Sequence, residues 1–211
     1  PFPEYSLNSY LNEVLIYSPS TTGLAGGNTY DEALLHALLE IIERESPEDE
    51  VIVKNAQNTL LDKIKHFFEY QVIYKKNNYD IPSFEVLLKS KNPFDNQVFF
   101  KGNGCHLNKN IALNRAITEA IQSRVTVIAG SRDDLIDSKY ETSEVTLFST
   151  IEAYPFEDIP DYSINKIAHA IDFLSAKAVK LNHDIVVFKY YEEDICILKA
   201  KIISMSLIHH V

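Results

Sequence analysis

Apolar residues that recur every three to four positions predict helices in several parts of this chain. The pattern covers residues 29–45, 55–71, 109–123 and 163–181 approximately. In the second of these segments the apolar residues would share one buried side: Leu60, Leu61, Ile64, Phe67 and Phe68. Each of these helices needs a sheet or another helix to cover its apolar side.

Runs rich in β-branched and aromatic residues predict strands between the helices. They lie at residues 51–54, 72–76, 83–90, 97–102, 145–149, 184–191 and 195–204. A polar turn separates 72–76 from 83–90, which predicts a hairpin. The mixture predicts the α/β class, in a mixed α+β arrangement of sheets flanked by helices. The predicted helix and strands after residue 163 form an α/β layer that carries the C-terminal strands.

A glycine-rich loop at residues 18–28 leads into the first strong helix. Backbone amides and the helix dipole at such a junction favour anions. The loop has neither the GK[ST] of a Walker A motif nor the spacing of the GxGxxG dinucleotide fingerprint. It therefore indicates an anion site only weakly by itself.

The helix after this loop places its acidic residues on one side. On a wheel of about 100° per residue, Glu32, Glu40 and Glu43 lie within roughly 80° of one another, and His36 falls among them. The residues on the opposite half are Leu34, Leu35, Leu38, Ile41 and Ile42, and Leu39 lies at the edge of the acidic side.

Two interpretations of this acidic stripe are open, a solvated face and a metal site. No Lys or Arg occurs from residue 29 to residue 43, so nothing on the helix relieves the repulsion between carboxylates until Arg44. Clustered carboxylates suit Mg²⁺, which also leaves room for phosphate oxygens. An arginine beside them could hold a phosphate through its planar fork.

The helix over 109–123 shows a milder form of the same pattern. Arg115, Glu119 and Gln122 share one face, while the apolar face contains Leu113, Ile117, Ala120 and Ile121. Arg124 stands at the end of this helix, where a positive charge also suits the helix C-terminus.

Composition narrows the function classes. The formal charge of −10 argues against sequence-independent binding to nucleic acid or to an anionic membrane. Cys105 and Cys196 have no metal-ligand or CxxC spacing, which favours reduced thiols in a cytoplasmic protein. No signal peptide or lipidation signal is visible, and no apolar run is long enough to span a bilayer.

Three segments together resemble the YcaO family of ATP-dependent enzymes that modify peptide backbones. They are TTGLAGGNTYDEALLHALLEIIER, GNGCHLNKNIALNRAITEAIQSR and VIAGSRDDL, in the family's order, within residues 20–136 approximately. The resemblance implies one YcaO-like domain over 1–211, with this motif-bearing core and a C-terminal α/β section over about 145–211.

The resemblance also implies a nucleotide and magnesium site. Asn28 and Glu32 would help to form it. Glu40, Glu43 and Arg44, from the ExxER motif, would add magnesium ligands and a phosphate contact.

Further roles follow from the same resemblance. Arg124 is the preferred arginine for the phosphates and Arg115 the second choice, while Glu119 and Gln122 would support the pocket. The metal ligands would then be Glu32, Glu40 and Glu43, and the catalytic group Arg44, Arg124 and Glu119. His36 is expected in a supporting or substrate-facing position. His106 and Cys105 are expected to serve loop structure rather than chemistry.

Family members phosphorylate a peptide amide oxygen with ATP, so that a nucleophile can displace phosphate. An internal Cys, Ser or Thr gives an azoline, and external sulfide gives a thioamide. The expected partners are a peptide or protein substrate, a leader-peptide-binding or sulfur-delivery protein, and a second copy of the chain.

The sequence departs from the family's pattern in two places. The family's nucleotide site also uses residues before the Gly-Asn turn, but only 27 residues precede Asn28 here and the first lysine is Lys54. We therefore expect the C-terminal portion of a longer polypeptide. The ending SMSLIHHV lacks the proline-rich tail of azoline-forming members. The alternative is a catalytically incomplete YcaO-like module that binds a peptide or a partner enzyme.

Overall fold

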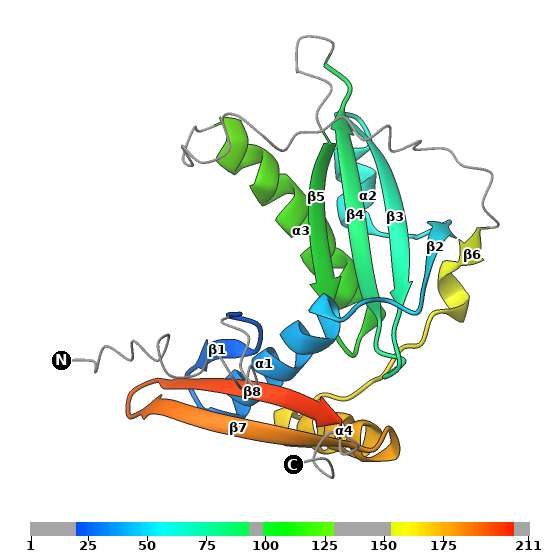
Figure 1. The fold of residues 1–211 in the computed structure, drawn as a ribbon. Helices are drawn as coiled ribbons and strands as arrows, with labels where there is room; N and C mark the ends of the chain where they lie inside the picture. Colours follow the sequence, from blue (N-terminus) through cyan, green and yellow to red (C-terminus); the bar gives the residue numbers. More distant parts are fainter. Residues whose placement is uncertain (1–19, 93–98, 129–152, 205–211) are drawn as a thin grey trace, which may run out of the picture.

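The computed structural model describes residues 20–92, 99–128 and 153–204, which form two sheets flanked by helices (Figure 1). This arrangement confirms the predicted mixed α/β class. No helix in these ranges is both long enough and apolar enough to cross a membrane.

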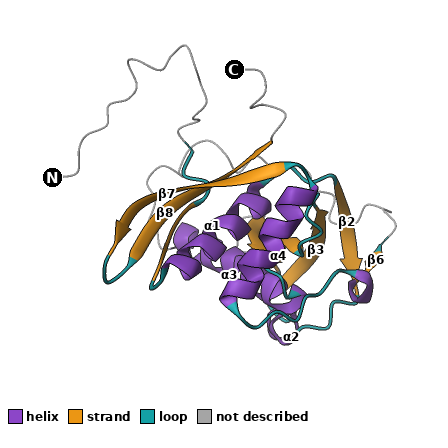
Figure 2. Ribbon diagram, turned by 90° about the horizontal axis from the view of Figure 1, so that it is seen from below, coloured by secondary structure: helices purple, strands orange, loops and turns teal. Residues whose placement is uncertain are grey.

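The smaller sheet has the strand order β1-β8-β7, with antiparallel neighbours. Its strands are β1 (Leu24–Gly27), β7 (His183–Glu192) and β8 (Cys196–Ser204). The helices α1 (Tyr30–Arg44) and α4 (Ile167–Lys180) pack against this sheet (Figure 2). Alternate residues of β8 are buried beneath these helices: Cys196, Leu198 and Ala200.

Gly23 is the point at which the chain enters this layer. Its φ of +77° lies in the left-handed region, and an added Cβ would come within 2.3 Å of the Ala200 carbonyl oxygen. Only glycine fits this position without displacing the central strand.

The larger sheet has the order β5-β4-β3-β2-β6. Its strands are β2 (Asp49–Lys54), β3 (Phe68–Lys76), β4 (Ser83–Ser90), β5 (Phe99–Cys105) and the short β6 (Tyr154–Pro155). The predicted hairpin is the β3–β4 pair, and β6 joins β2 in parallel. The helix α3 (Lys109–Ile128) packs on β5 and β4, and α2 (Thr59–Ile64) borders the same core.

The contact between α3 and β5 is a seam of small residues, namely Gly102 and Gly104 on the strand and Ala112, Ala116 and Ala120 on the helix. A Cβ on Gly102 would lie 2.2 Å from the Ala116 carbonyl oxygen, and one on Gly104 would lie 2.3 Å from that of Ala112. The three alanines are fully buried. The backbone of α3 therefore lies directly on β5, and this close contact determines how far the polar face of α3 stands from the sheet.

The prediction of one helix over 55–71 is wrong. The helix α2 ends at Ile64, and residues 68–71 belong to β3. Asn58 caps α2 by accepting from the amides of Leu60 and Leu61. Phe67, expected on the buried side, is 68% exposed. Residues 68–74 of β3 pair with β4, from Phe68↔Ser90 to Tyr74↔Phe84, and this pairing outweighs the local helical pattern.

The other predicted elements differ mainly in their ends. The first helix is confirmed, with Thr29 and Glu45 as its caps. The helix predicted over 109–123 continues to Ile128, and that over 163–181 spans Ile167–Lys180. The predicted strand at 145–149 and most of the VIAGSRDDL segment lie outside the described residues.

Candidate active site

The entry to α1 uses Glu32 as part of its cap. The Thr29 hydroxyl accepts from the Glu32 amide at 3.2 Å, and Glu32 Oε2 accepts from the Asn28 amide at 2.8 Å. This exchange satisfies amides that the first turn leaves without helical partners. One carboxylate oxygen of Glu32 is thus engaged in closing the glycine-rich turn.

Glu40 joins the helix to the start of the glycine-rich loop. Its Oε2 accepts from the Gly23 amide at 3.1 Å, and its Oε1 pairs with Arg44 Nη2 at 2.9 Å. Arg44 also donates from Nη1 to the Thr22 hydroxyl at 3.4 Å. Glu40 and Arg44 therefore hold residues 22–23 against the last turns of α1.

Glu43 is a partly buried carboxylate of the acidic stripe. Burial raises its pKa, and the nearby charge of Glu119 raises it further. Arg115 and Arg44 act in the opposite direction, as does a hydrogen bond from the backbone of Cys105. The two carboxylates come from different helices, so the fold itself brings these like charges together.

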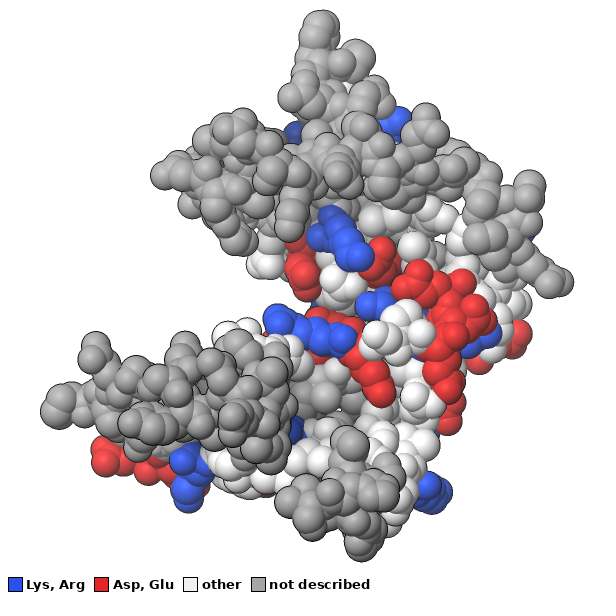
Figure 3. All heavy atoms as spheres, in the orientation of Figure 1, with Lys and Arg blue, Asp and Glu red and all other residues white. Residues whose placement is uncertain are grey.

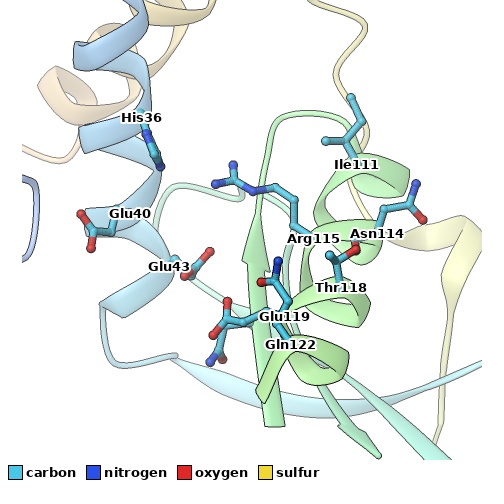
Figure 4. A pocket seen from close by; sticks show the side chains of 10 residues that line it. His36, Glu40, Glu43, Ile111, Asn114, Arg115, Thr118, Glu119 and Gln122 are labelled. Atoms are coloured by element: carbon cyan, nitrogen blue, oxygen red, sulfur yellow. The ribbon is translucent and has the colours of Figure 1, made fainter. Parts of the chain in front are cut away.

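These carboxylates open into a cleft of about 500 Å³ between α1 and α3, here called the Glu43 cleft. Figure 3 shows charged side chains of both signs gathered where the molecule is hollowed between its two layers. Figure 4 shows Arg115 reaching from α3 toward α1, near Glu43. The residues that line the cleft are His36, Glu40, Glu43, Asn103, Ile111, Asn114, Arg115, Thr118, Glu119 and Gln122.

A smaller hollow of about 290 Å³, here called the His106 hollow, adjoins this cleft because His36 and Arg115 line both. Glu32 lies in the His106 hollow rather than in the Glu43 cleft. The helical wheel shows the direction in which Glu32 points but not its position along the helix axis. Glu32 and Glu43 are eleven residues apart, which is about 16 Å along that axis.

Within the described ranges, no three His, Cys, Asp or Glu residues form a cluster that could hold a metal. The proposed ligands Glu32, Glu40 and Glu43 are therefore not gathered at one point.

The two candidate arginines occupy different places. Arg115 lies in the Glu43 cleft and donates from Nη1 to the Cys105 carbonyl at 3.2 Å. Arg124, the preferred choice from the sequence, lies over the ring of Phe68 at 5.4 Å and lines another hollow, with His66 and Lys91. Neither Asn28 nor Arg44 lines the Glu43 cleft or the His106 hollow. The geometry therefore favours Arg115 over Arg124 as the partner of the carboxylates.

Several lining residues were not singled out from the sequence. Ile111, Asn114 and Thr118 extend the face of α3 that contains Arg115, Glu119 and Gln122, at helical intervals of three and four. That spacing is visible in the sequence and could have identified them. Asn103 could not be found this way, because it comes from β5 and only the packing of α3 brings it to the cleft.

Asn103 also bears on whether a divalent cation fits the cleft. Its Oδ1 is buried and has no hydrogen-bond partner in the described part of the chain. Asn103 lines the same cleft as Glu43 and Glu119, and amide and carboxylate oxygens are hard ligands of the kind that Mg²⁺ prefers. Mg²⁺ commonly takes only one or two protein carboxylates and completes its shell with water and phosphate oxygens. The residues present therefore fit Mg²⁺ with a phosphate ligand.

The cysteines take no part in this surface. Cys105 and Cys196 are free and buried in the core under α1. Burial raises the pKa of the Cys105 thiol well above its ordinary value. Both behave as small apolar core residues.

Comparison with known proteins identifies the family and the fold. Residues 7–204 match the model of the YcaO family, described as an ATP- and Mg²⁺-binding cyclodehydratase. An uncharacterized protein of Mycobacterium tuberculosis is 36% identical over an alignment of 138 residues, and the match covers 59% of this chain and 31% of the relative. The chain thus spans about a third of the length of that curated relative.

Solved structures share the fold. The heterocyclase TruD superposes with a TM-score of 0.70 at 19% identity, over 90% of this chain and 30% of its own. YcaO from Methanopyrus kandleri, bound with AMPPCP and Mg²⁺, gives a TM-score of 0.68 at 13% identity, over 88% and 55%. The family match covers nearly the whole sequence and confirms the resemblance drawn from the three motifs: the chain belongs to the YcaO family.

Proposed function

We propose that this chain provides one side of an ATP- and Mg²⁺-dependent site that activates a peptide backbone amide. The observation that carries the proposal is the Glu43–Glu119 pair, which lines one cleft together with Arg115 and Asn103, whose buried amide oxygen has no partner in the described part of the chain. The family description, ATP- and Mg²⁺-binding cyclodehydratase, supports the same assignment.

Each of these residues has a distinct part. Glu43 and Glu119 would bind the cation, with Asn103 Oδ1 as a neutral ligand, because their mutual repulsion falls when a cation lies between them. Arg115 would hold a phosphate group and keep it oriented. ATP and Mg²⁺ would supply the transferable phosphoryl group and neutralise its negative charge.

The reaction we propose is O-phosphorylation of the amide. The amide oxygen would bond to the γ-phosphorus as the bond to ADP breaks, and a nucleophile would then add to the amide carbon as phosphate leaves. An internal Cys, Ser or Thr would give an azoline, whereas sulfide would give a thioamide. The substrate is a ribosomally made peptide or protein, delivered with a leader-peptide-binding or sulfur-supplying partner.

Isothermal titration of the intact protein with AMPPCP, with and without Mg²⁺, tests the site. We expect Mg²⁺-dependent binding that Glu43→Gln and Glu119→Gln each weaken at least tenfold. Glu69→Gln, an exposed carboxylate on β3, is the control and should leave affinity unchanged. Binding that does not depend on Mg²⁺ or on either carboxylate would contradict the proposal. A complete lack of AMPPCP binding would favour the alternative, a YcaO-like module that binds a peptide or partner enzyme without catalysis.

A further inference from the structure

The His106 hollow is built from several elements around one imidazole. His106 follows β5, where its backbone amide donates to the Pro82 carbonyl at 3.1 Å. Its ring is fixed by the Asn108 amide, which donates to Nδ1 at 3.0 Å. Asn108 in turn caps α3, accepting from the amides of Asn110 and Ile111. The ring orientation is therefore determined by the start of α3.

This hydrogen bond determines what the other ring nitrogen can do. Since Nδ1 accepts, the neutral ring has its proton on Nε2. Burial lowers the pKa of His106 and the charge of Arg115 lowers it further, while a backbone hydrogen bond at Asn108 acts in the opposite direction, so the net effect favours the neutral ring. His106 lines the hollow, and because Nδ1 accepts from the Asn108 amide, Nε2–H is the donor that the neutral ring offers. His106 thus presents an N–H donor to the hollow.

The rest of the hollow combines an apolar wall with few polar groups. Leu35 and Leu39 come from α1, and Ile167 is the first residue of α4. Arg115 adds a second donor, and Glu32 adds a carboxylate acceptor. A backbone amide has one acceptor, one donor and an adjoining side chain. The hollow offers donors for the amide oxygen, a carboxylate acceptor for the amide N–H, and an apolar wall for the side chain.

We propose that the His106 hollow binds the peptide amide that is to be modified, with the amide oxygen accepting from His106 Nε2–H. The neighbouring side chain lies against Leu35, Leu39 and Ile167, and Glu32 accepts from the amide N–H. This assignment rests on the proposed function, since it places the amide oxygen beside Arg115, at the boundary with the Glu43 cleft. His106 then has a substrate-binding role rather than only a part in loop structure.

The probe is a capped dipeptide, N-acetyl-leucyl-cysteine N-methylamide, added to the intact protein without nucleotide. Nuclear magnetic resonance follows the His106 ring nitrogens and the Ile167 methyl groups, and titration gives the dissociation constant. We expect the resonances of both groups to change on addition of the dipeptide. His106→Phe should weaken binding about tenfold, the usual value of one well-placed hydrogen bond. His106→Gln, which keeps a side-chain N–H, should recover most of the affinity.

Two further variants separate this role from a structural one. Ile167→Ser changes only the apolar wall and should weaken peptide binding severalfold while leaving AMPPCP binding unchanged. His66→Phe replaces an exposed histidine outside the hollow and should have no effect. Binding that His106→Phe and Ile167→Ser both leave unchanged would overturn the proposal. So would competition between the dipeptide and Mg²⁺·AMPPCP, which would assign the hollow to nucleotide. Loss of AMPPCP binding alone bears on the proposed function and not on this result.

Discussion

Glu43 on α1 and Glu119 on α3 lie close enough for the charge of Glu119 to raise the pKa of Glu43. Folding therefore brings together two groups that repel each other when both are ionised, and Arg115 offsets the repulsion only in part. An arrangement that disfavours its own charged form is typical of sites that receive a cation or a proton.

Glu43→Gln should stabilise the protein at neutral pH. The folded-state pKa of Glu43 is raised, so its favourable contribution is complete below the unfolded pKa, about 4.3, and is lost as pH rises through the folded pKa. The neutral Gln avoids this loss. We expect a Tm higher by about 2–4 °C at pH 7, which corresponds to about 1 kcal/mol. The gain should vanish near pH 4. Calorimetry at both pH values checks this, and an equal gain at both would contradict it.

Arg115→Lys and Arg124→Lys form a matched pair on the same helix. A lysine keeps the charge but loses the planar fork that holds phosphate. We expect Arg115→Lys to weaken Mg²⁺·AMPPCP binding about tenfold and Arg124→Lys to leave it within about twofold, one bidentate contact being worth roughly 1–2 kcal/mol. Titration calorimetry measures both. The opposite order would restore Arg124 as the phosphate ligand.

Glu40→Ala should release the loop before β1. Glu40 accepts from the Gly23 amide, and removing this acceptor leaves that amide open to solvent. Hydrogen exchange at Gly23 should quicken about fivefold, as expected for the loss of about 1 kcal/mol of local protection. In Glu40→Gln the remaining carbonyl oxygen can still accept, so exchange should stay close to that of the unaltered protein. Equal exchange in all three proteins would show that the contact does not hold the loop.

Gly104→Ala should move α3 away from β5. The new Cβ would meet the Ala112 carbonyl oxygen at 2.3 Å, and a backbone atom cannot turn aside. We expect a loss of about 1–3 kcal/mol in the free energy of unfolding and weaker Mg²⁺·AMPPCP binding. Gly26→Ala is the control, because its Cβ would meet only an ordinary contact at 3.8 Å. Urea denaturation measures the free energy of unfolding of the two variants. Equal losses would contradict the inference that the seam needs glycine at position 104.

The sequence predicted the residue types of the site better than their positions in space. The polar face of α3 and the acidic stripe of α1 could both be derived from helical spacing. The wheel could not show that Glu32 and Glu43 are separated along the helix, nor that Glu40 is engaged by Gly23. It does put Arg115 and Arg124 on opposite sides of their helix, about 180° apart, but only the packing of α3 on β5 decides which arginine faces α1. The helix predicted over 55–71 was wrong for a related reason, because the pairing of β3 is not local.

The glycine and alanine seam under α3 has a consequence for how this cleft could be compared or redesigned. The distance between the walls of the cleft depends on how closely α3 approaches β5. Gly102 and Gly104 have no Cβ, so the helix backbone can lie directly on the strand. None of the seam residues lines the cleft itself. Two relatives with identical lining residues but different seams would hold Arg115 and Glu119 at different distances from Glu43. A search restricted to residues that touch the ligand would overlook the positions that set the width of the site.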